Sequence, residues 1–157
     1  MTDKVRYASE RGPTSTVTTY VHNEDTSSDP AFAALGNEQY LSLTTFRKSG
    51  ERVSTPMWVG RDGDALIMFT PEASGKVKRL RNNPCVELRP CSRLGRVKDG
   101  VEPVVGMAEI LLDEESRARG TEIIRRKYGL GYMVVMGIER LIKSGQQKRV
   151  ILRITHA

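Results

Sequence analysis

Residues 40–70 read YLSLTTFRKSGERVSTPMWVGRDGDALIMFT. Three runs rich in β-forming residues, at 40–46, 52–60 and 65–70, are separated by the turn sequences KSGE and RDGD. An Asp-Gly pair between two such runs is a strong hairpin signal, and glycine in KSGE suits a second tight turn. This stretch predicts a three-stranded antiparallel meander.

The chain on either side of this meander alternates short helices with further strands. TPEASGKVKRLRNNP, residues 70–84, predicts a helix because Ser74 can cap its start, Val77 and Leu80 face one side, and Pro84 follows its end. Further strands are predicted at 85–91, 104–112 and 148–156, and further helices at 30–36, from Asp113 to the break at Gly129–Gly131, and at 132–145. Hairpins outnumber strand–helix alternations in this pattern. It predicts a mainly β fold: a six-stranded antiparallel barrel with accessory α-helices.

A length of 157 residues suits one domain with a real core. Residues 1–28 are rich in Thr, Ser and charge without a sustained period, so they are predicted to form a flexible amino-terminal arm, with 29–157 as the folded domain. No stretch approaches the roughly 20 apolar residues of a membrane span, and the first residues lack the apolar segment of a signal peptide. We therefore expect a cytoplasmic protein.

Metal and nucleophilic chemistry find few candidate residues. His22 lies in the predicted arm and His156 next to the carboxyl end, so neither is placed to activate a nucleophile or to share a metal with cysteine. No metal site is predicted. Cys85 and Cys91 lie in an extended run, which would separate them by roughly 20 Å and makes them free buried thiols.

A net charge of +6 predicts an anionic partner, but the charge alone does not distinguish nucleic acid, a membrane surface and a phosphorylated small molecule. Phe69 is the only aromatic residue near the basic helix, and no RNA-recognition or helix-turn-helix signature accompanies it, which disfavours nucleic acid. The glycines at 129–137 lack the βαβ context of a dinucleotide fingerprint, and Ser74-Gly75-Lys76 has the wrong order for a P-loop.

The start of the basic helix is the first candidate site. A helix start presents free backbone N–H groups and a partial positive charge, so Ser74, Gly75 and Lys76 predict a phosphate cradle, with Thr70 nearby. Arg79 shares one side of the helix with Lys76. The cations on the other side, Lys78 and Arg81, are interpreted as a solvated outer face.

The second candidate is the strand RVSTPMWVG. Pro56 removes a backbone donor in mid-strand, which indicates an edge, a bulge or a surface facing a ligand. Trp58 follows two residues later, and simple core packing is the default interpretation for the only tryptophan of a small domain.

Residues 35–155 resemble the pyridoxamine 5′-phosphate oxidase-like split-barrel flavoproteins, also called the FMN-binding split barrel. The resemblance is strongest to the actinobacterial branch that uses the deazaflavin coenzyme F420 instead of FMN. Its most specific parts are Ser-Thr-Pro-Met-Trp at 54–58 and Ser-Gly-Lys-Val-Lys-Arg-Leu-Arg-Asn-Asn-Pro at 74–84. The arm of about 28 residues departs from the family pattern.

The resemblance implies a homodimer with cofactor grooves at the subunit interface. In each groove the phosphate would be held at Thr70, Ser74, Gly75, Lys76 and Arg79. The ring would lie against the backbone of Thr55, Pro56, Met57 and Trp58.

The implied activity is hydride transfer between reduced F420 and an unsaturated small organic substrate, with the protein supplying orientation and electrostatics. No dedicated side-chain base is predicted. Tyr128, Tyr132 and solvent are the candidate proton donors. Two alternatives stay open: an FMN-dependent oxidoreductase of the same fold, and a non-catalytic module that binds a flavin, haem or a lipid-like ligand.

Overall fold

The computed structural model describes residues 29–142 and 147–157. The predicted arm, residues 1–28, and the last residues of the predicted 132–145 helix lie outside this part of the chain. The strands are β1 (Leu41–Phe46), β2 (Arg52–Met57), β3 (Gly60–Asp62), β4 (Ala65–Pro71), β5 (Cys85–Pro90), β6 (Val104–Leu111) and β7 (Arg149–His156). The helices are α1 (Pro30–Leu35), α2 (Gly75–Asn82), α3 (Glu114–Tyr128) and α4 (Leu130–Ile142).

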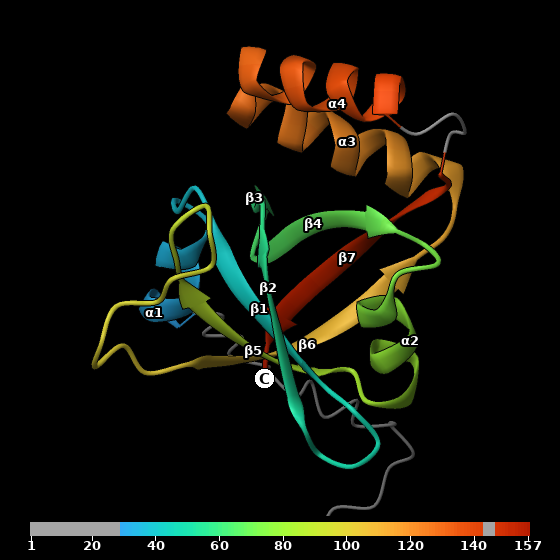
Figure 1. The fold of residues 1–157 in the computed structure, drawn as a ribbon. Coiled ribbons are helices and arrows are strands. Elements are labelled where there is room, and N and C mark those ends of the chain that lie inside the picture. Colours follow the sequence, from blue (N-terminus) through green and yellow to red (C-terminus); the bar gives the residue numbers. More distant parts are fainter. Residues whose placement is uncertain (1–28, 143–146) are drawn as a thin grey trace, which may run out of the picture.

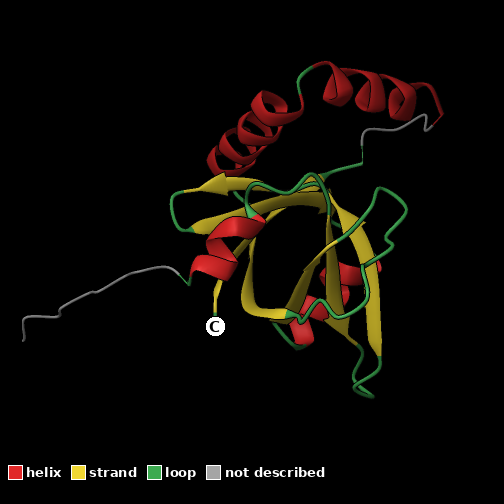
Figure 2. Cartoon of the chain, turned by 90° about the vertical axis from the view of Figure 1, so that its left-hand side faces the viewer, coloured by secondary structure: helices red, strands yellow, loops and turns green. Residues whose placement is uncertain are grey.

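The strands form one antiparallel sheet in the order β2-β1-β5-β6-β7-β4-β3. β2 and β3 therefore lie at opposite edges of the sheet, although only Trp58 and Val59 separate them in the chain. So short a link requires the sheet to curl until its two edges meet at this corner (Figures 1 and 2). The sheet is closed at the corner and open elsewhere, which confirms the predicted mainly β, split-barrel fold.

The described residues contain seven strands, whereas the sequence predicts six. The difference is the predicted strand 52–60, which is broken at Trp58–Val59 into β2 and β3 on the two edges. The Asp62-Gly63 hairpin is confirmed between β3 and β4, where Gly63 has a φ of 60° that favours glycine.

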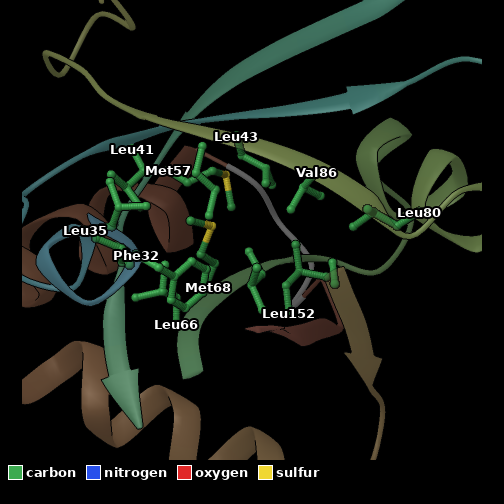
Figure 3. Close-up of a cluster of buried hydrophobic side chains, with 14 residues drawn as sticks. Phe32, Leu35, Leu41, Leu43, Met57, Leu66, Met68, Leu80, Val86 and Leu152 are labelled. Atoms are coloured by element: carbon green, nitrogen blue, oxygen red, sulfur yellow. The ribbon is translucent and has the colours of Figure 1, made fainter. Parts of the chain in front are cut away.

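The core lies inside the curl of the sheet (Figure 3). Alternate residues of the strands point inward, so that Leu41 and Leu43 of β1 face Leu66 and Met68 of β4 across the interior. Leu80 of α2 joins the same cluster. This period of two explains why the strand predictions succeed.

The predicted ends of α3 are confirmed, whereas α4 starts at Leu130 instead of residue 132, directly after Gly129. Asp113 caps α3 by accepting a hydrogen bond of 2.7 Å from the Ser116 amide, and Gly129 ends the helix with a φ of 51°. α3 packs on β3, β4 and β7, and α4 packs on α3 (Figure 1). No helix of the described residues is long and apolar enough to cross a membrane.

The cysteine prediction is half right. Cys85 and Cys91 are free thiols, but both are partly exposed rather than buried. Cys85 is the first residue of β5, and Cys91 lies just beyond its end, where it forms an isolated bridge with Val97.

Candidate functional site

Five polar side chains meet where the start of α2 faces the ends of β1 and β4; we call them the basic cluster: Thr45, Thr70, Ser74, Lys76 and Arg79. Lys76 Nζ donates to Thr70 Oγ1 at 3.1 Å, and the Oγ atoms of Thr70 and Ser74 lie 3.3 Å apart. Arg79 Nε donates to Thr45 Oγ1 at 2.8 Å. The cluster therefore contains four of the residues predicted to bind a phosphate and one residue, Thr45, that was not predicted.

The two cations of the basic cluster are half-buried. Neither forms an ion pair with a carboxylate of residues 29–142 or 147–157, since their polar contacts there are with threonine hydroxyls. Burial lowers the pKa of Lys76, and the nearby charge of Arg79 lowers it further. This is an electropositive site with unused capacity for an anion.

Ser74 and Gly75 complete the cluster in ways that differ in detail from the prediction. Ser74 is the N-cap residue of α2, but its side chain makes no hydrogen bond to the helix amides, because its hydroxyl faces Thr70 instead. A Cβ on Gly75 would lie 3.0 Å from the terminal guanidinium nitrogen Nη1 of Arg79. Gly75 thus leaves room for the Arg79 head group.

Thr45 is the member of the cluster that sequence reasoning missed. Leu41, Leu43 and Thr45 alternate along β1 and point to the same face, so a fully buried threonine continues a row of core residues. A polar residue at an inward position of a strand was the available signal. Its use depends on Arg79, which approaches from another element.

Lys78 and Arg81 lie outside the cluster, as predicted. Lys78 is exposed, and the Arg81 guanidinium lies 3.8 Å from Glu72 on the outer side of α2.

The predicted ring-binding segment, Thr55–Trp58, spans the end of β2 and the corner that follows. β2 is an edge strand, which agrees with the edge interpretation of Pro56. Thr55 pairs with Leu43 and shares the inward face of the β1–β2 ladder with Thr45, whereas the Met57 side chain is part of the core. Met57 therefore offers a ligand only its backbone.

The segment is connected to the basic cluster through the β1–β2 ladder. Thr45 Oγ1, the acceptor for Arg79, donates to Val53 O at 3.4 Å. Thr55 to Trp58 lie two to five residues beyond Val53, which corresponds to roughly 7 to 17 Å along the strand. This distance separates the basic cluster from the part of the β2 edge that is predicted to contact the cofactor ring.

Trp58 is half-buried and lies outside the main core cluster, so its default interpretation as simple core is wrong. Its ring stacks on Tyr128, with centroids 4.6 Å apart and planes 15° apart, and lies 6.2 Å from the Phe69 ring and 6.3 Å from the Tyr132 ring. Phe69 and Thr70 are adjacent in β4 and point to opposite faces. The Trp58 ring is therefore under α3 and α4, while Thr70 points into the barrel.

The two tyrosines named as candidate proton donors differ in their surroundings. The Tyr128 hydroxyl donates to Gln39 O at 2.6 Å and accepts from the Val59 amide at 3.0 Å. Burial raises the pKa of Tyr128 to about 12. This hydroxyl is committed to the backbone, which argues against it as a proton donor. Tyr132 contacts Trp58 and Phe69 through its ring.

A cavity of about 430 Å³ lies at the other end of α2, between this helix and the β1–β2 turn. It contains none of the predicted site residues and is lined by Phe46, Arg47, Lys48, Gly50, Asn82 and Asn83. Elsewhere, no three His, Cys, Asp or Glu side chains within the described ranges are grouped to hold a metal ion.

Comparison with known proteins agrees with this fold. A family model described as pyridoxamine 5′-phosphate oxidase matches residues 28–157. No curated protein matches the sequence.

Several solved structures share the architecture. A conserved hypothetical protein from Mycobacterium tuberculosis is 23% identical, with a TM-score of 0.59 over 82% of this chain and 80% of that one. An F420 reductase is 18% identical, with a TM-score of 0.51 over 82% and 95%. The heme storage protein HutZ from Vibrio cholerae is 13% identical, with a TM-score of 0.56 over 82% and 89%. Identities this low show the fold alone. The family model, in contrast, covers most of the chain, and the protein therefore belongs to the pyridoxamine 5′-phosphate oxidase family.

Proposed function

We propose that the chain binds a phosphorylated flavin-type cofactor, coenzyme F420 in preference to FMN, and acts as an oxidoreductase on a small unsaturated organic substrate. The observation that carries the proposal is that two half-buried cations, Lys76 and Arg79, lie close together. Within the described chain their side chains contact hydroxyl groups and no carboxylate. Keeping two like charges together without a counterion costs free energy, and a bound phosphate offsets that cost.

The donors of the basic cluster fit a phosphate. Lys76 and Arg79 would supply charge-assisted hydrogen bonds to a phosphate, and the hydroxyls of Thr70 and Ser74 would supply neutral ones. The start of α2, where the helix dipole is positive, lies at the same site. The ring would then lie against the edge backbone of β2 from Thr55 to Trp58. An edge strand has unpaired backbone groups that suit the polar rim of a planar heterocycle.

When bound, the cofactor supplies hydride transfer to an electron-poor C=C, C=N or carbonyl group. The chain's own contribution is to hold the phosphate, to orient the ring on β2 and to exclude water with the aromatic residues around Trp58. Tyr132 or solvent supplies the proton, since the Tyr128 hydroxyl is bonded to Gln39 and Val59.

The preference for F420 rests on its longer anionic tail, which needs a longer cationic track. Lys78 and Arg81 offer only exposed contacts, and Arg81 already faces Glu72. The cavity that contains Arg47 and Lys48 lies at the far end of α2, roughly 10 Å from Gly75 at 1.5 Å per residue. Arg47 already pairs with Glu51 at 3.1 Å, so Lys48 is the cation of this cavity that adds to the candidates for a tail contact, contributing about 0.2 to 1 kcal/mol and weakening with salt.

The test is a paired titration of F420 and FMN at low and high salt, followed by turnover assays with the reduced cofactor. We expect F420 to bind more tightly, with a margin that shrinks as salt rises. Tighter FMN binding at every salt concentration would reassign the protein to the FMN-dependent alternative. Cofactor binding without turnover on any electron-poor acceptor would favour a non-catalytic flavin-binding module. Binding of haem or a lipid with no flavin affinity would overturn the proposal.

The proposed assembly is a homodimer. α4 presents Leu130, Met133, Val134 and Ile138 to solvent, each at least half exposed, and β6 presents Val105 and Met107. Apolar surface of this extent is uncommon on a monomer, and a second copy related by a two-fold axis would cover it.

A further inference from the structure

The corner between β2 and β3 is held by side chains from α3 instead of by a strand ladder. The Val59 amide donates to the Tyr128 hydroxyl at 3.0 Å, and Val59 O accepts from Lys127 Nζ at 2.8 Å. These bonds satisfy the backbone at the residue where the predicted strand is broken. They therefore explain how the chain can leave one edge of the sheet and join the other.

The same two side chains also tie the corner to the segment before β1. Lys127 Nζ donates to the carbonyls of Gly36, at 2.9 Å, and Glu38, while Tyr128 donates to Gln39 O at 2.6 Å. Although Lys127 is exposed as a whole residue, its ammonium group lies among three carbonyl oxygens. The end of α3, the entry to β1 and the corner are thus joined at one point.

This junction also contacts Trp58. The Tyr128 ring lies against the Trp58 ring, as described above, and its hydroxyl fixes the next residue in the chain. α3 also packs directly on the corner, because a Cβ on Gly60 would lie 2.5 Å from Ile123 Cγ2. Moving the end of α3 would therefore move Trp58 and the end of β2.

We propose that Lys127 and Tyr128 are positioning residues that hold the barrel corner, and through it orient Trp58 and the edge of β2 for a planar ligand. The ligand part of this inference rests on the proposed function, whereas the corner itself does not. Burial raises the pKa of Tyr128 to about 12, so the hydroxyl keeps the proton it needs in order to donate and accept at once.

The test uses Trp58, the only tryptophan of the chain, as an internal fluorophore. Tyr128→Phe keeps the stacked ring and removes both hydroxyl bonds, and Lys127→Met removes the ammonium group. Arg126→Met is the matched control, because Arg126 is the preceding residue and pairs with Glu122 away from the corner. Circular dichroism first checks that each variant is folded. In the protein without ligand, we expect both corner variants to shift Trp58 emission to longer wavelength and to increase its quenching by acrylamide. The control should stay at the wild-type values, and Lys127→Arg should recover part of the change.

A second measurement separates positioning from general loss of stability. Affinity for FMN or F420 should fall by roughly tenfold in Tyr128→Phe, whereas inorganic phosphate, which needs only the basic cluster, should bind as in the wild type. Unchanged Trp58 emission and quenching in both corner variants, or an equal change in Arg126→Met, would overturn the inference. Equal loss of phosphate and ring-containing ligand would overturn it too. Failure of the wild type to bind either cofactor would refute the proposed function, and the fluorescence measurement would still decide the role of the corner.

Discussion

Single residues decide whether the basic cluster is a binding site or merely a charged surface. Lys76 and Lys78 are two residues apart on one helix, yet Lys76 is half-buried against Thr70 and Lys78 is exposed. They form a matched pair, because both carry the same charge and only one points into the cluster.

Lys76→Ala should weaken cofactor binding by about 1.5 to 3 kcal/mol, the usual loss for a charge-assisted hydrogen bond. Lys78→Ala should cost less than about 0.5 kcal/mol, as for most exposed positions. Fluorescence titration of both variants measures the difference. An equal loss in the two variants would remove the phosphate site from the basic cluster.

The lowered pKa of Lys76 predicts a pH dependence. Burial and Arg79 bring this pKa below the ordinary 10.5, so the free protein loses the Lys76 charge earlier than an exposed lysine does. The affinity for a phosphorylated cofactor should have its highest value near neutral pH, where Lys76 is charged, and should fall as the pH rises through the lowered pKa of Lys76. In Lys76→Arg the guanidinium stays charged, and the fall should disappear. Dissociation constants measured from neutral to alkaline pH test this, and identical profiles for the two proteins would contradict it.

The lowered pKa of Lys76 affects the stability of the free protein in the opposite direction to its effect on cofactor affinity. Because the unfolded chain holds the Lys76 proton more tightly than the folded chain does, the Lys76 contribution to the free energy of unfolding rises with pH in this range.

At the scale of elements, the close packing of α3 on the sheet depends on glycine. A Cβ on Gly120 would lie 2.5 Å from Ile151 Cδ1 and 2.8 Å from Ile151 Cγ1, whereas a Cβ on Gly131 in α4 would meet no atom within 4 Å. Alanine favours helix by about 1 kcal/mol over glycine, but overpacking a buried site costs about 1 to 3 kcal/mol.

We therefore expect Gly120→Ala to lower the free energy of unfolding by about 1 to 2 kcal/mol, and Gly131→Ala to leave it unchanged or slightly raised. Urea unfolding at one protein concentration compares the two. Ile151→Val removes the Cδ1 atom that lies nearest to the new methyl group. In the Ile151→Val background, Gly120→Ala should therefore lower the free energy of unfolding by less than it does in the wild type. If Gly120→Ala stabilises the protein, the helix does not pack this closely on β7.

For the whole molecule, the question is what covers α4. Leu130, Val134 and Ile138 follow one another at intervals of four residues, so they form one apolar stripe on the helix. Light scattering at micromolar concentration should give twice the mass of the chain. Val134→Glu combined with Ile138→Glu should shift the protein toward monomer, while Ala118→Glu, on the exposed side of α3, should leave the mass unchanged. A monomer in the wild type would remove the proposed interface.

Local sequence patterns are sufficient for much of this molecule. The inward row Leu41, Leu43 and the hairpin at Asp62-Gly63 follow from a period of two and from turn chemistry, both of which act within a few residues. The grouping of Ser74, Lys76 and Arg79 likewise follows from helix spacing, because residues that are neighbours on a helix are determined by the chain itself. The mainly β fold and most members of the basic cluster could therefore be predicted.

What the sequence could not determine depends on contacts between distant segments. Thr45 becomes part of the cluster only because Arg79, 34 positions later, reaches it. The strand predicted over 52–60 is broken at Trp58–Val59, and the Val59 amide donates to the hydroxyl of Tyr128, 69 positions later, instead of to a neighbouring strand. A hydrogen bond between such residues forms only when the sheet has curled and α3 has packed, and no local period encodes that event. The sequence by itself thus determined the strands, the turns and the cationic helix, whereas the tertiary structure alone decided where the barrel closes, which tyrosine is committed to the backbone and which hydroxyls surround the two cations.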